Sequence, residues 1–238
     1  MRKILITNDD GICSEGIVCL AKAAQRFGEV YVVAPETQRS AFSHSITLHR
    51  HIDIYPHDFP VDGVHAFSCG GTPADCVRIG HRFVIPGGAD VVLSGINHGY
   101  NMATDIQYSA TAGAAFEASF QGIIGIAVSE GTGGCHEVRD RYLSGILEEF
   151  IDYDPGFGKI VNVNLPDCTL EECRGILYDR KVSVCSPFID DYVEKEKLPE
   201  GGIRIVIDGK TGTEAEEGSD FRAILDRYVS IGIANNIS

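Results

Sequence analysis

Two adjacent carboxylates, Asp9 and Asp10, follow a short apolar run and stand directly before Gly11. The run at 3–7 predicts a buried strand, and the glycine allows the backbone to turn where that strand ends. Two neighbouring anions are costly to remove from water unless a cation lies beside them. The motif therefore indicates a metal site, although the same residues taken alone could form an ordinary turn with a helix cap.

Side chains with oxygen ligands also follow two later predicted strands. The loop at 35–43 is rich in hydroxyl groups, including that of Ser40, and the loop at 95–101 contains Asn97 and Asn101. Ligands of open α/β sheets bind at the carboxyl ends of the strands, so we expect these loops to meet. Carboxylate, hydroxyl and amide oxygens suit Mg²⁺ or Mn²⁺ better than a structural Zn²⁺. Each loop alone is equally well explained as a turn or a flexible segment.

A phosphate site is predicted beside this metal. Residues 109–120 have the small-residue composition of a helix that packs closely on a sheet. The start of this helix, Ser109 to Gly113, offers hydroxyls and free backbone N–H groups, which commonly bind phosphate. Magnesium and manganese ions usually share phosphate oxygens with their protein ligands.

Strands and helices alternate as far as about residue 165. We expect strands at 3–7, 29–34, 89–94, 123–129 and 160–164, and helices at 15–27, from Pro73 onward with Thr72 as its cap, at 109–120 and at 142–151. This alternation predicts an α/β fold with an open, mainly parallel sheet and helices on both faces. An alternating apolar pattern at 46–54 predicts a half-exposed strand or hairpin beside a strand at 64–68.

The pattern changes after Pro166. Short strands are predicted at 175–178, 182–185 and 203–208, with a charged, glycine-bearing stretch at 190–202 between them. We expect a single domain, 1–238, with a core of about 1–165 and 216–238 and a C-terminal β-hairpin excursion over about 167–215. Exposed strand edges commonly pair with another subunit, so we also expect a homo-oligomer formed through this region.

Composition restricts the partners. A formal charge of −14 repels polyanions, so we expect neither nonspecific nucleic-acid binding nor binding to anionic membranes. No apolar stretch reaches the roughly 18–20 residues that span a bilayer. The residues before Asn8 are too few for the apolar region of a signal peptide, which predicts a cytoplasmic protein.

Cysteines and histidines give no separate metal signal. The chain has 8 cysteines, without the two-residue spacing of a zinc knuckle, and we interpret them as small core residues in a reducing compartment. His49 and His51 alternate near His44, a pattern more typical of an exposed polar face than of a ligand set.

Several ordered motifs resemble the SurE family of survival proteins, which are metal-dependent nucleoside monophosphate phosphatases. They are ILITNDDG at 4–11, APETQRSAFSHSITL at 34–48, GGTPADCV at 70–77, SGINHGYN at 94–101 and YSATAGAAFEA at 108–118. The resemblance continues through 219–221 and 228–231. It implies a Rossmann-like core and a 5'- and 3'-nucleotidase, often active on short polyphosphate. It also implies homodimers or homotetramers that exchange C-terminal segments.

The resemblance also assigns site residues. It implies that the metal is held by Asp9, Asp10, Ser40 and Asn97. It places Asn101, Ser109 and Thr111 in the phosphate pocket.

The chain departs from the family pattern near this pocket. Glycine is more common in the family at Ala41 and Ala110, and Ala112 is a further departure within the helix opening. Each adds a methyl group, so the substrate range is less certain than metal binding. His98 falls at a variable position of its motif, and no role is carried over to it.

The expected reaction is hydrolysis of the phosphomonoester by a water that the metal activates, with Asp9 or Asp10 orienting or deprotonating it. Direct attack by an aspartate, giving a phosphoenzyme, is the alternative. A phosphoacceptor signalling module is disfavoured, because Asp53 lies midway along the alternating segment and no lysine falls between Lys22 and Lys159. A dinucleotide-binding oxidoreductase is equally disfavoured, because the first turn lacks a G-x-G-x-x-G loop.

Overall fold

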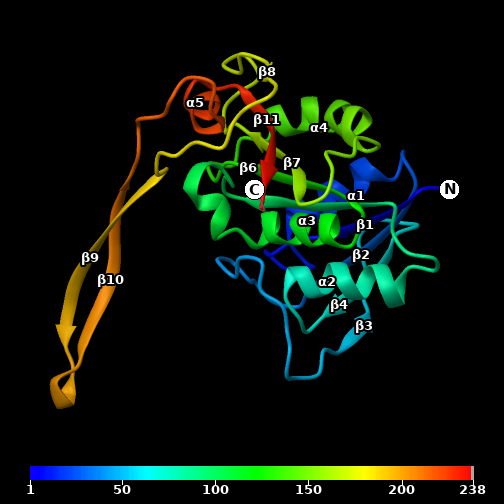
Figure 1. The fold of residues 1–238 in the computed structure, drawn as a ribbon, viewed down its shortest axis with the longest axis horizontal. Helices are drawn as coiled ribbons and strands as arrows, with labels where there is room; N and C mark the ends of the chain where they lie inside the picture. Colours follow the sequence, from blue (N-terminus) through cyan, green and yellow to red (C-terminus); the bar gives the residue numbers. More distant parts are fainter. Residues whose placement is uncertain (237–238) are drawn as a thin grey trace.

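The computed structural model describes residues 1–236 of the chain. The last two residues of the predicted domain, 237–238, lie outside the described residues. Within residues 1–236, nine strands form one sheet in the order β3-β4-β2-β1-β5-β6-β7-β11-β8 (Figure 1). The strands are β1 (Lys3–Thr7), β2 (Glu29–Pro35), β3 (Ile54–Pro56), β4 (His65–Cys69), β5 (Val91–His98), β6 (Ile124–Glu130), β7 (Lys159–Leu165), β8 (Ile176–Leu177) and β11 (Val229–Asn235).

The sheet is mainly parallel, as predicted. Strands β4, β2, β1, β5, β6 and β7 all pair in parallel. Strand β3 at one edge pairs antiparallel with β4, whereas β11 pairs antiparallel with β7 and parallel with the edge strand β8. The central strands are continuous apolar runs because parallel strands are covered on both faces.

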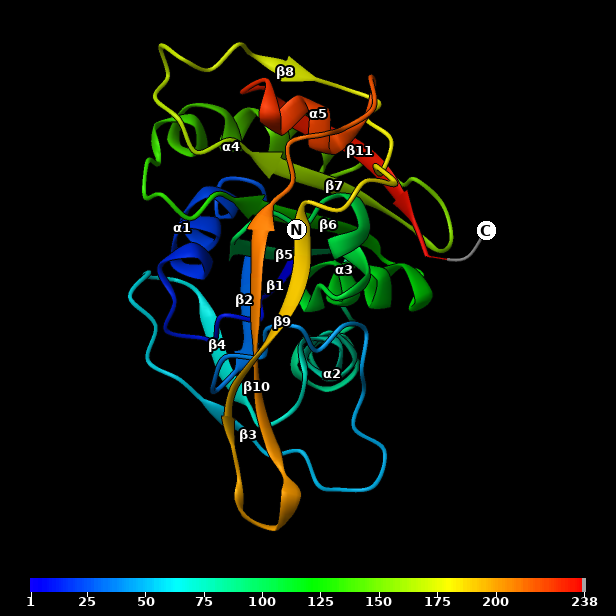
Figure 2. The same ribbon diagram turned by 90° about the vertical axis from the view of Figure 1, so that its left-hand side faces the viewer.

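Helices cover both faces of the sheet, which confirms the predicted fold class. On one face α1 (Glu15–Ala24) packs on β1, whose Ile4 and Ile6 belong to the same core, and α4 (Glu137–Phe150) packs on α1 and β7. On the other face α2 (Pro73–Ile79) packs on Leu5. Alternate residues of one strand therefore serve opposite layers. Also on that second face, α3 (Ala110–Phe120) runs beside α2, while the short α5 (Asp220–Leu225) lies beside β11 (Figures 1 and 2).

Several predicted elements differ in the structure. Residues 46–53 form no strand despite their alternation, because only β3 pairs with the edge of β4. Strand β5 continues past Ser94 to His98, since Asn97 and His98 pair with β6 after a shift in register. The segment 182–185 is not a strand, whereas the charged stretch predicted as a connection contains β9 (Phe188–Lys197).

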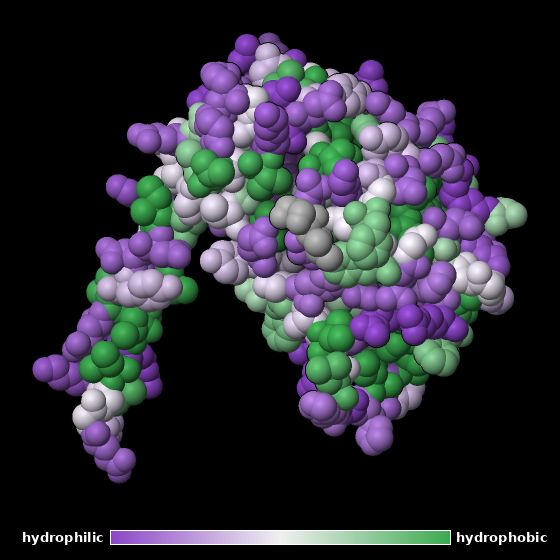
Figure 3. All heavy atoms as spheres, in the orientation of Figure 1, coloured by the Kyte–Doolittle hydropathy of each residue, from purple (hydrophilic) through white to green (hydrophobic). Residues whose placement is uncertain are grey.

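Strands β9 and β10 (Ile203–Thr211) form a separate two-stranded antiparallel hairpin. The hairpin projects well away from the body in Figure 1 and passes in front of it in Figure 2. Hydrophobic residues are spread along its surface in Figure 3. The predicted excursion is thus a long arm with two exposed faces.

The base of the hairpin is tied to the body by two carboxylates. Asp220 accepts hydrogen bonds from the backbone N–H groups of Ala103 (3.0 Å) and Ser183 (2.9 Å). Glu216 accepts from the Ser183 hydroxyl (2.6 Å) and from the N–H of Val184 (2.8 Å). These hydrogen bonds lower the pKa of Glu216 to about 2. Both ends of the hairpin are therefore held beside the segment that contains Ala103.

Thr72 begins α2 with a capping box, as the sequence predicted. Its hydroxyl accepts from the N–H of Asp75 (3.1 Å) and donates to the carbonyl of Ser45 (2.7 Å), while the Asp75 carboxylate accepts from the N–H of Thr72 (3.0 Å). Thr72 thus fixes both the helix and the loop that precedes β3.

We predict that Thr72→Ala lowers the free energy of unfolding by about 1–2 kcal/mol, because the cap and the bond to Ser45 are both lost. In a chain of this size that corresponds to a fall in Tm of roughly 2–4 °C for each kcal/mol. Thermal melts followed by circular dichroism measure the change, with the exposed Thr213→Ala as the matched control. Equal Tm values for the two variants would contradict the role of the cap.

Candidate functional site

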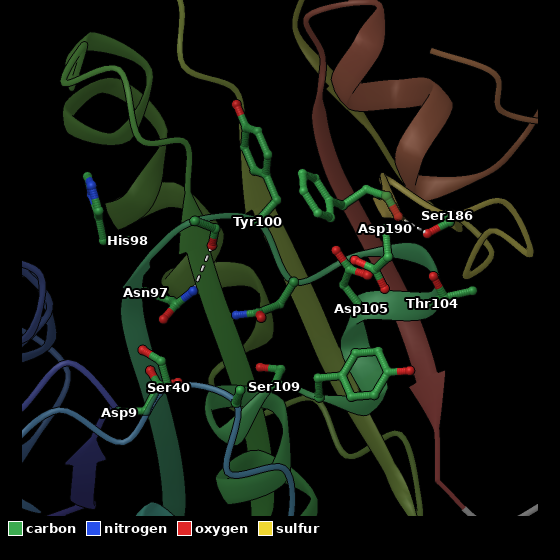
Figure 4. Close-up of a pocket in the computed structure, with 15 residues that line it drawn as sticks. Asp9, Ser40, Asn97, His98, Tyr100, Thr104, Asp105, Ser109, Ser186 and Asp190 are labelled. Carbon is green, nitrogen blue, oxygen red and sulfur yellow. Dashed lines mark hydrogen bonds between the residues drawn. The ribbon is translucent and has the colours of Figure 1, made fainter. Parts of the chain in front are cut away.

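The candidate site lies where the strand order reverses. Strand β1 has β2 on one side and β5 on the other, so the connections from β1 to the two halves of the sheet run in opposite directions. Such a switch point leaves a crevice beyond the carboxyl ends of the strands, the usual ligand position in open α/β sheets. Asp9 follows β1 there, and Asn97 lies near the carboxyl end of β5 (Figure 4).

Asp9 is buried, and both its side chain and its backbone carbonyl accept hydrogen bonds. Its side chain accepts a hydrogen bond from the Thr111 hydroxyl (2.7 Å), and its backbone carbonyl accepts from the N–H of Arg39 (2.6 Å). Burial raises the pKa of Asp9 to about 6, the Thr111 hydrogen bond lowers it in part, and the charge of Asp10 raises it further. The carboxylate is therefore held in a place that favours a neighbouring cation.

Asp10 is half-buried, and its Oδ2 accepts from the backbone N–H of His98 (3.1 Å). This bond joins the loop after β1 to the end of β5. Asp10 adjoins the cavity described below without lining it. Thr111 does not line it either, because its hydroxyl lies beneath Asp9.

Two glycines allow this loop to lie so close to β5. Gly11 has a φ of +97°, a conformation that side chains disfavour. At Gly16 an added Cβ would stand 2.1 Å from the carbonyl oxygen of Ile96. The glycines thus set both the turn after Asp10 and the contact between α1 and β5.

The loop that carries Ser40 is fastened on both sides. Ser43 donates its hydroxyl to the carbonyl of Gln107 (2.9 Å). The His44 ring hydrogen-bonds through Nε2 to the nearly buried carboxylate of Glu117 (2.8 Å) and stacks on Phe120 of α3. Ser40 itself is exposed, and its hydroxyl oxygen accepts from the side-chain amide of Gln38 (3.0 Å). The flexible loop expected from composition is therefore clamped to α3.

The amide and hydroxyl groups of the phosphate side are also held in place. The carbonyl of Asn101 accepts from Asn162 (2.8 Å) and Asn164 (3.1 Å), and its side chain donates to Ser129 (2.8 Å). Ser109 is the N-cap of α3, where its Oγ accepts from the N–H of Ala112 (2.9 Å), as expected for a helix start that faces a ligand.

These residues line one cavity of about 510 Å³, a size typical of small-ligand sites. Its lining consists of Asp9, Ser40, Ala41, Asn97, His98, Gly99, Tyr100, Asn101, Thr104, Asp105, Tyr108, Ser109, Ser186, Phe188 and Asp190. Of the predicted site residues, the structure brings Asp9, Ser40, Asn97, Asn101 and Ser109 to this cavity (Figure 4). Among the described residues, no lysine or arginine lines it.

The oxygen ligands fit a divalent metal. Asn97 donates its side-chain N–H to the carbonyl of Gly99 (2.7 Å), which leaves its Oδ1 free. Asp9 and Ser40 likewise retain lone pairs, so the donor set is hard and free of thiolate. Within residues 1–236 there is no cluster of three or more His, Cys, Asp or Glu side chains that could hold a metal. A metal here would therefore depend on the hydroxyl and amide oxygens as well as on the carboxylates.

The sequence did not predict the residues at the far wall of the cavity, among them Tyr108, Phe188 and Asp190. Tyr108 directly precedes Ser109, so its position in the same motif could have indicated it. Phe188 and Asp190 come from β9 of the hairpin, and no local pattern connects them with a site so distant in the chain.

Fold and cavity together define an α/β protein with a candidate site for a metal ion and a phosphate. The profile of the family described as "Survival protein SurE" matches residues 4–185. The chain is 36% identical over 233 residues to "5'-nucleotidase SurE" of Clostridium botulinum (strain Kyoto / Type A2), covering 96% of this chain and 90% of that protein.

Other relatives agree. The chain is 35% identical over 237 residues to "5'-nucleotidase SurE" of Thermosipho melanesiensis, covering 96% of this chain and 89% of that one. The crystal structure of the SurE protein from Aquifex aeolicus superposes with a TM-score of 0.83 at 32% identity, covering 98% of this chain and 93% of that one. The chain belongs to the SurE family, as its motifs indicated.

The structure bears on two further expectations. All 8 cysteines are free thiols, but only Cys69, Cys76 and Cys168 are buried, so their interpretation as mostly core residues is wrong. Among the helices of residues 1–236, none combines the length and the apolar character needed to cross a membrane.

We predict that Mg²⁺ or Mn²⁺ raises the Tm of the protein, because an ion that binds only the folded state stabilises it. Asp10→Asn should remove most of this rise, since it deletes a charge beside Asp9 and weakens the bond to His98. Thermal melts at increasing metal concentration measure the effect, with the exposed Asp58→Asn as the matched control. An equal rise in Asp10→Asn would exclude Asp10 from the metal site.

Proposed function

We propose that this protein is a metal-dependent 5'-nucleotidase that hydrolyses nucleoside monophosphates. The observation that carries the proposal is that the buried carboxylate of Asp9 and the N-terminus of α3 at Ser109 face one cavity. The names of the curated relatives support the same reaction. Activity on 3'-monophosphates and on short polyphosphate, and a place in the cytoplasm, belong to the proposal as finer expectations.

The metal ligands in this proposal are Asp9, Asp10, Ser40 and Asn97, with Mg²⁺ or Mn²⁺ as the ion. When bound, such an ion supplies positive charge to the phosphate oxygens and acidifies a water. A cation is needed to bind a phosphate here, because the described lining contains three carboxylates, of Asp9, Asp105 and Asp190, and no lysine or arginine.

The phosphate is bound by Ser109 and Asn101, in our proposal. The Ser109 hydroxyl can donate to a phosphate oxygen while its Oγ caps the helix, and the first turn of α3 presents backbone N–H groups beside it. Thr111, the third predicted residue, supports the phosphate side through Asp9, whose carboxylate it orients.

The attacking group is a water, with Asp9 or Asp10 orienting it or taking its proton. Burial raises the pKa of Asp9 to about 6, near the range in which a general base works at neutral pH. Direct attack by an aspartate would instead leave an aspartyl phosphate, which rapid acid quench can trap. Recovery of such an adduct would overturn the water mechanism.

We predict that Asp9→Asn and Asp10→Asn each lower kcat/KM by at least about 100-fold while the circular dichroism spectrum is unchanged, because each removes metal affinity and a candidate base. The assay uses a panel of nucleoside 5'- and 3'-monophosphates, short polyphosphate and p-nitrophenyl phosphate, first with EDTA and then with Mg²⁺, Mn²⁺ or Zn²⁺. Asp58→Asn serves as the control. Full rates in both site variants would reject the assignment.

We also propose that the hairpin over about 167–215 is an oligomerisation arm and that the rest of the described chain is one domain. Both faces of the arm expose large apolar side chains, namely Ile189, Tyr192, Val193, Ile203, Ile205, Val206 and Ile207. An exposed hairpin of this composition would aggregate unless another surface covers it. A homodimer or homotetramer would supply that surface.

We predict that the unmodified protein is a dimer or tetramer in light scattering and that Tyr192→Ser with Ile207→Ser shifts it toward the monomer. The two residues pair across the hairpin on one face. Replacing both removes about 3–5 kcal/mol of the hydrophobic free energy that burying them against another subunit would supply. Val184→Ser, which alters an exposed residue outside the paired strands β9 and β10, is the control. A monodisperse monomer of the unmodified chain would contradict the arm.

A further inference from the structure

The cavity has a second end that the proposed chemistry does not use. Asp105 lies in the 3₁₀ turn Ala103–Gln107, and Asp190 lies in β9 of the hairpin. In Figure 4 these two carboxylates stand on the side of the cavity opposite Asp9 and Ser40, with Ser109 between the two ends. A ligand whose phosphate is bound at Ser109 would extend toward them.

Two aromatic side chains line the same cavity while remaining accessible. Tyr108 is 64% exposed and Phe188 is 39% exposed. The Phe188 ring lies over Gly209 of β10, where an added Cβ would stand 2.5 Å from the ring, so the absence of a side chain at Gly209 makes room for it. Phe188 and Asp190 are two residues apart on one strand and therefore share a face. Accessible rings of this kind stack on planar ligands.

The two carboxylates need hydrogen-bond donors. Burial raises the pKa of Asp105, and the nearby charge of Asp190 raises it further, while the Thr104 hydroxyl lowers it. No lysine or arginine among the described lining residues neutralises the pair. Ionised carboxylates only accept hydrogen bonds, so a neutral ligand with N–H groups fits this end and a polyanion does not.

We propose that this end is a nucleobase subsite, in which Tyr108 and Phe188 stack on the base and Asp105 and Asp190 accept its N–H groups, so that guanine is selected. The inference rests on the proposed nucleotidase function, because it assumes a nucleotide whose phosphate lies at Ser109. It names the substrate preference of that same cavity.

Guanine follows from the pattern of donors on the base edge. Guanine presents a ring N–H and an adjacent amino group with no acceptor between them. Adenine and cytosine place an acceptor nitrogen beside the amino group, and uracil flanks its single N–H with two carbonyls, so each sets a lone pair against a carboxylate. Sites built on hydrogen bonds discriminate strongly between such analogues.

The first test compares kcat/KM for GMP, IMP, UMP and p-nitrophenyl phosphate with Mg²⁺ or Mn²⁺. We expect GMP to exceed UMP by at least about tenfold, with IMP, which lacks the amino group, between them. Asp190→Asn should reduce the GMP to UMP ratio toward one. Phe188→Ala should lower GMP relative to p-nitrophenyl phosphate by about tenfold. Asp191→Asn, on the opposite face of β9, should keep the ratios of the unmodified protein.

The second test separates this inference from the nucleotidase function. Calorimetric titration with guanosine and uridine needs neither a phosphate nor turnover. Tighter binding of guanosine that is lost in Asp190→Asn supports the subsite even if no phosphomonoester is hydrolysed, which would overturn the nucleotidase alone. Equal binding of the two nucleosides, with GMP and UMP hydrolysed at equal rates, would overturn the subsite and leave the nucleotidase standing.

Discussion

The arrangement of the site depends on one constraint, the burial of the Asp9 carboxylate at the end of the central strand. A buried anion needs hydrogen bonds and a neighbouring cation. Thr111 supplies one hydrogen bond from the start of α3, and Arg39 is bonded to the Asp9 carbonyl, so three separate segments converge on a single residue. The same convergence brings the hydroxyl of Ser40 and the capped N-terminus of α3 within reach of one ligand.

The parts of the fold that sequence predicted well are those decided by local chemistry. The apolar run of β1, the turn at Gly11 and the cap at Thr72 each follow from a few adjacent residues. The predictions were wrong where pairing with a distant strand determines whether a segment forms a strand. Strand β5 extends to His98 because β6 offers partners there, and the alternating residues 46–53 stay irregular because no strand pairs with them.

The candidate site divides in the same way. Asp9, Ser40, Asn97, Asn101 and Ser109 were predictable because each follows or begins an element whose edge position is fixed by the parallel sheet. The far end of the cavity was not predictable. Phe188 and Asp190 reach Asp105 only because Asp220 and Glu216 fasten the base of the hairpin, and a contact across some eighty residues leaves no periodic signal.

The tie between Asp220, Ala103 and Ser183 gives the hairpin a fixed pivot beside the cavity. Because Phe188 and Asp190 of the hairpin line one end of the cavity, the space between Asp190 and Asp105 depends on the position in which these hydrogen bonds hold the arm. In the proposed nucleobase subsite, selectivity for the base would therefore depend on how the arm is packed. Relatives whose arms pack differently would share the catalytic end yet differ in the nucleosides they accept.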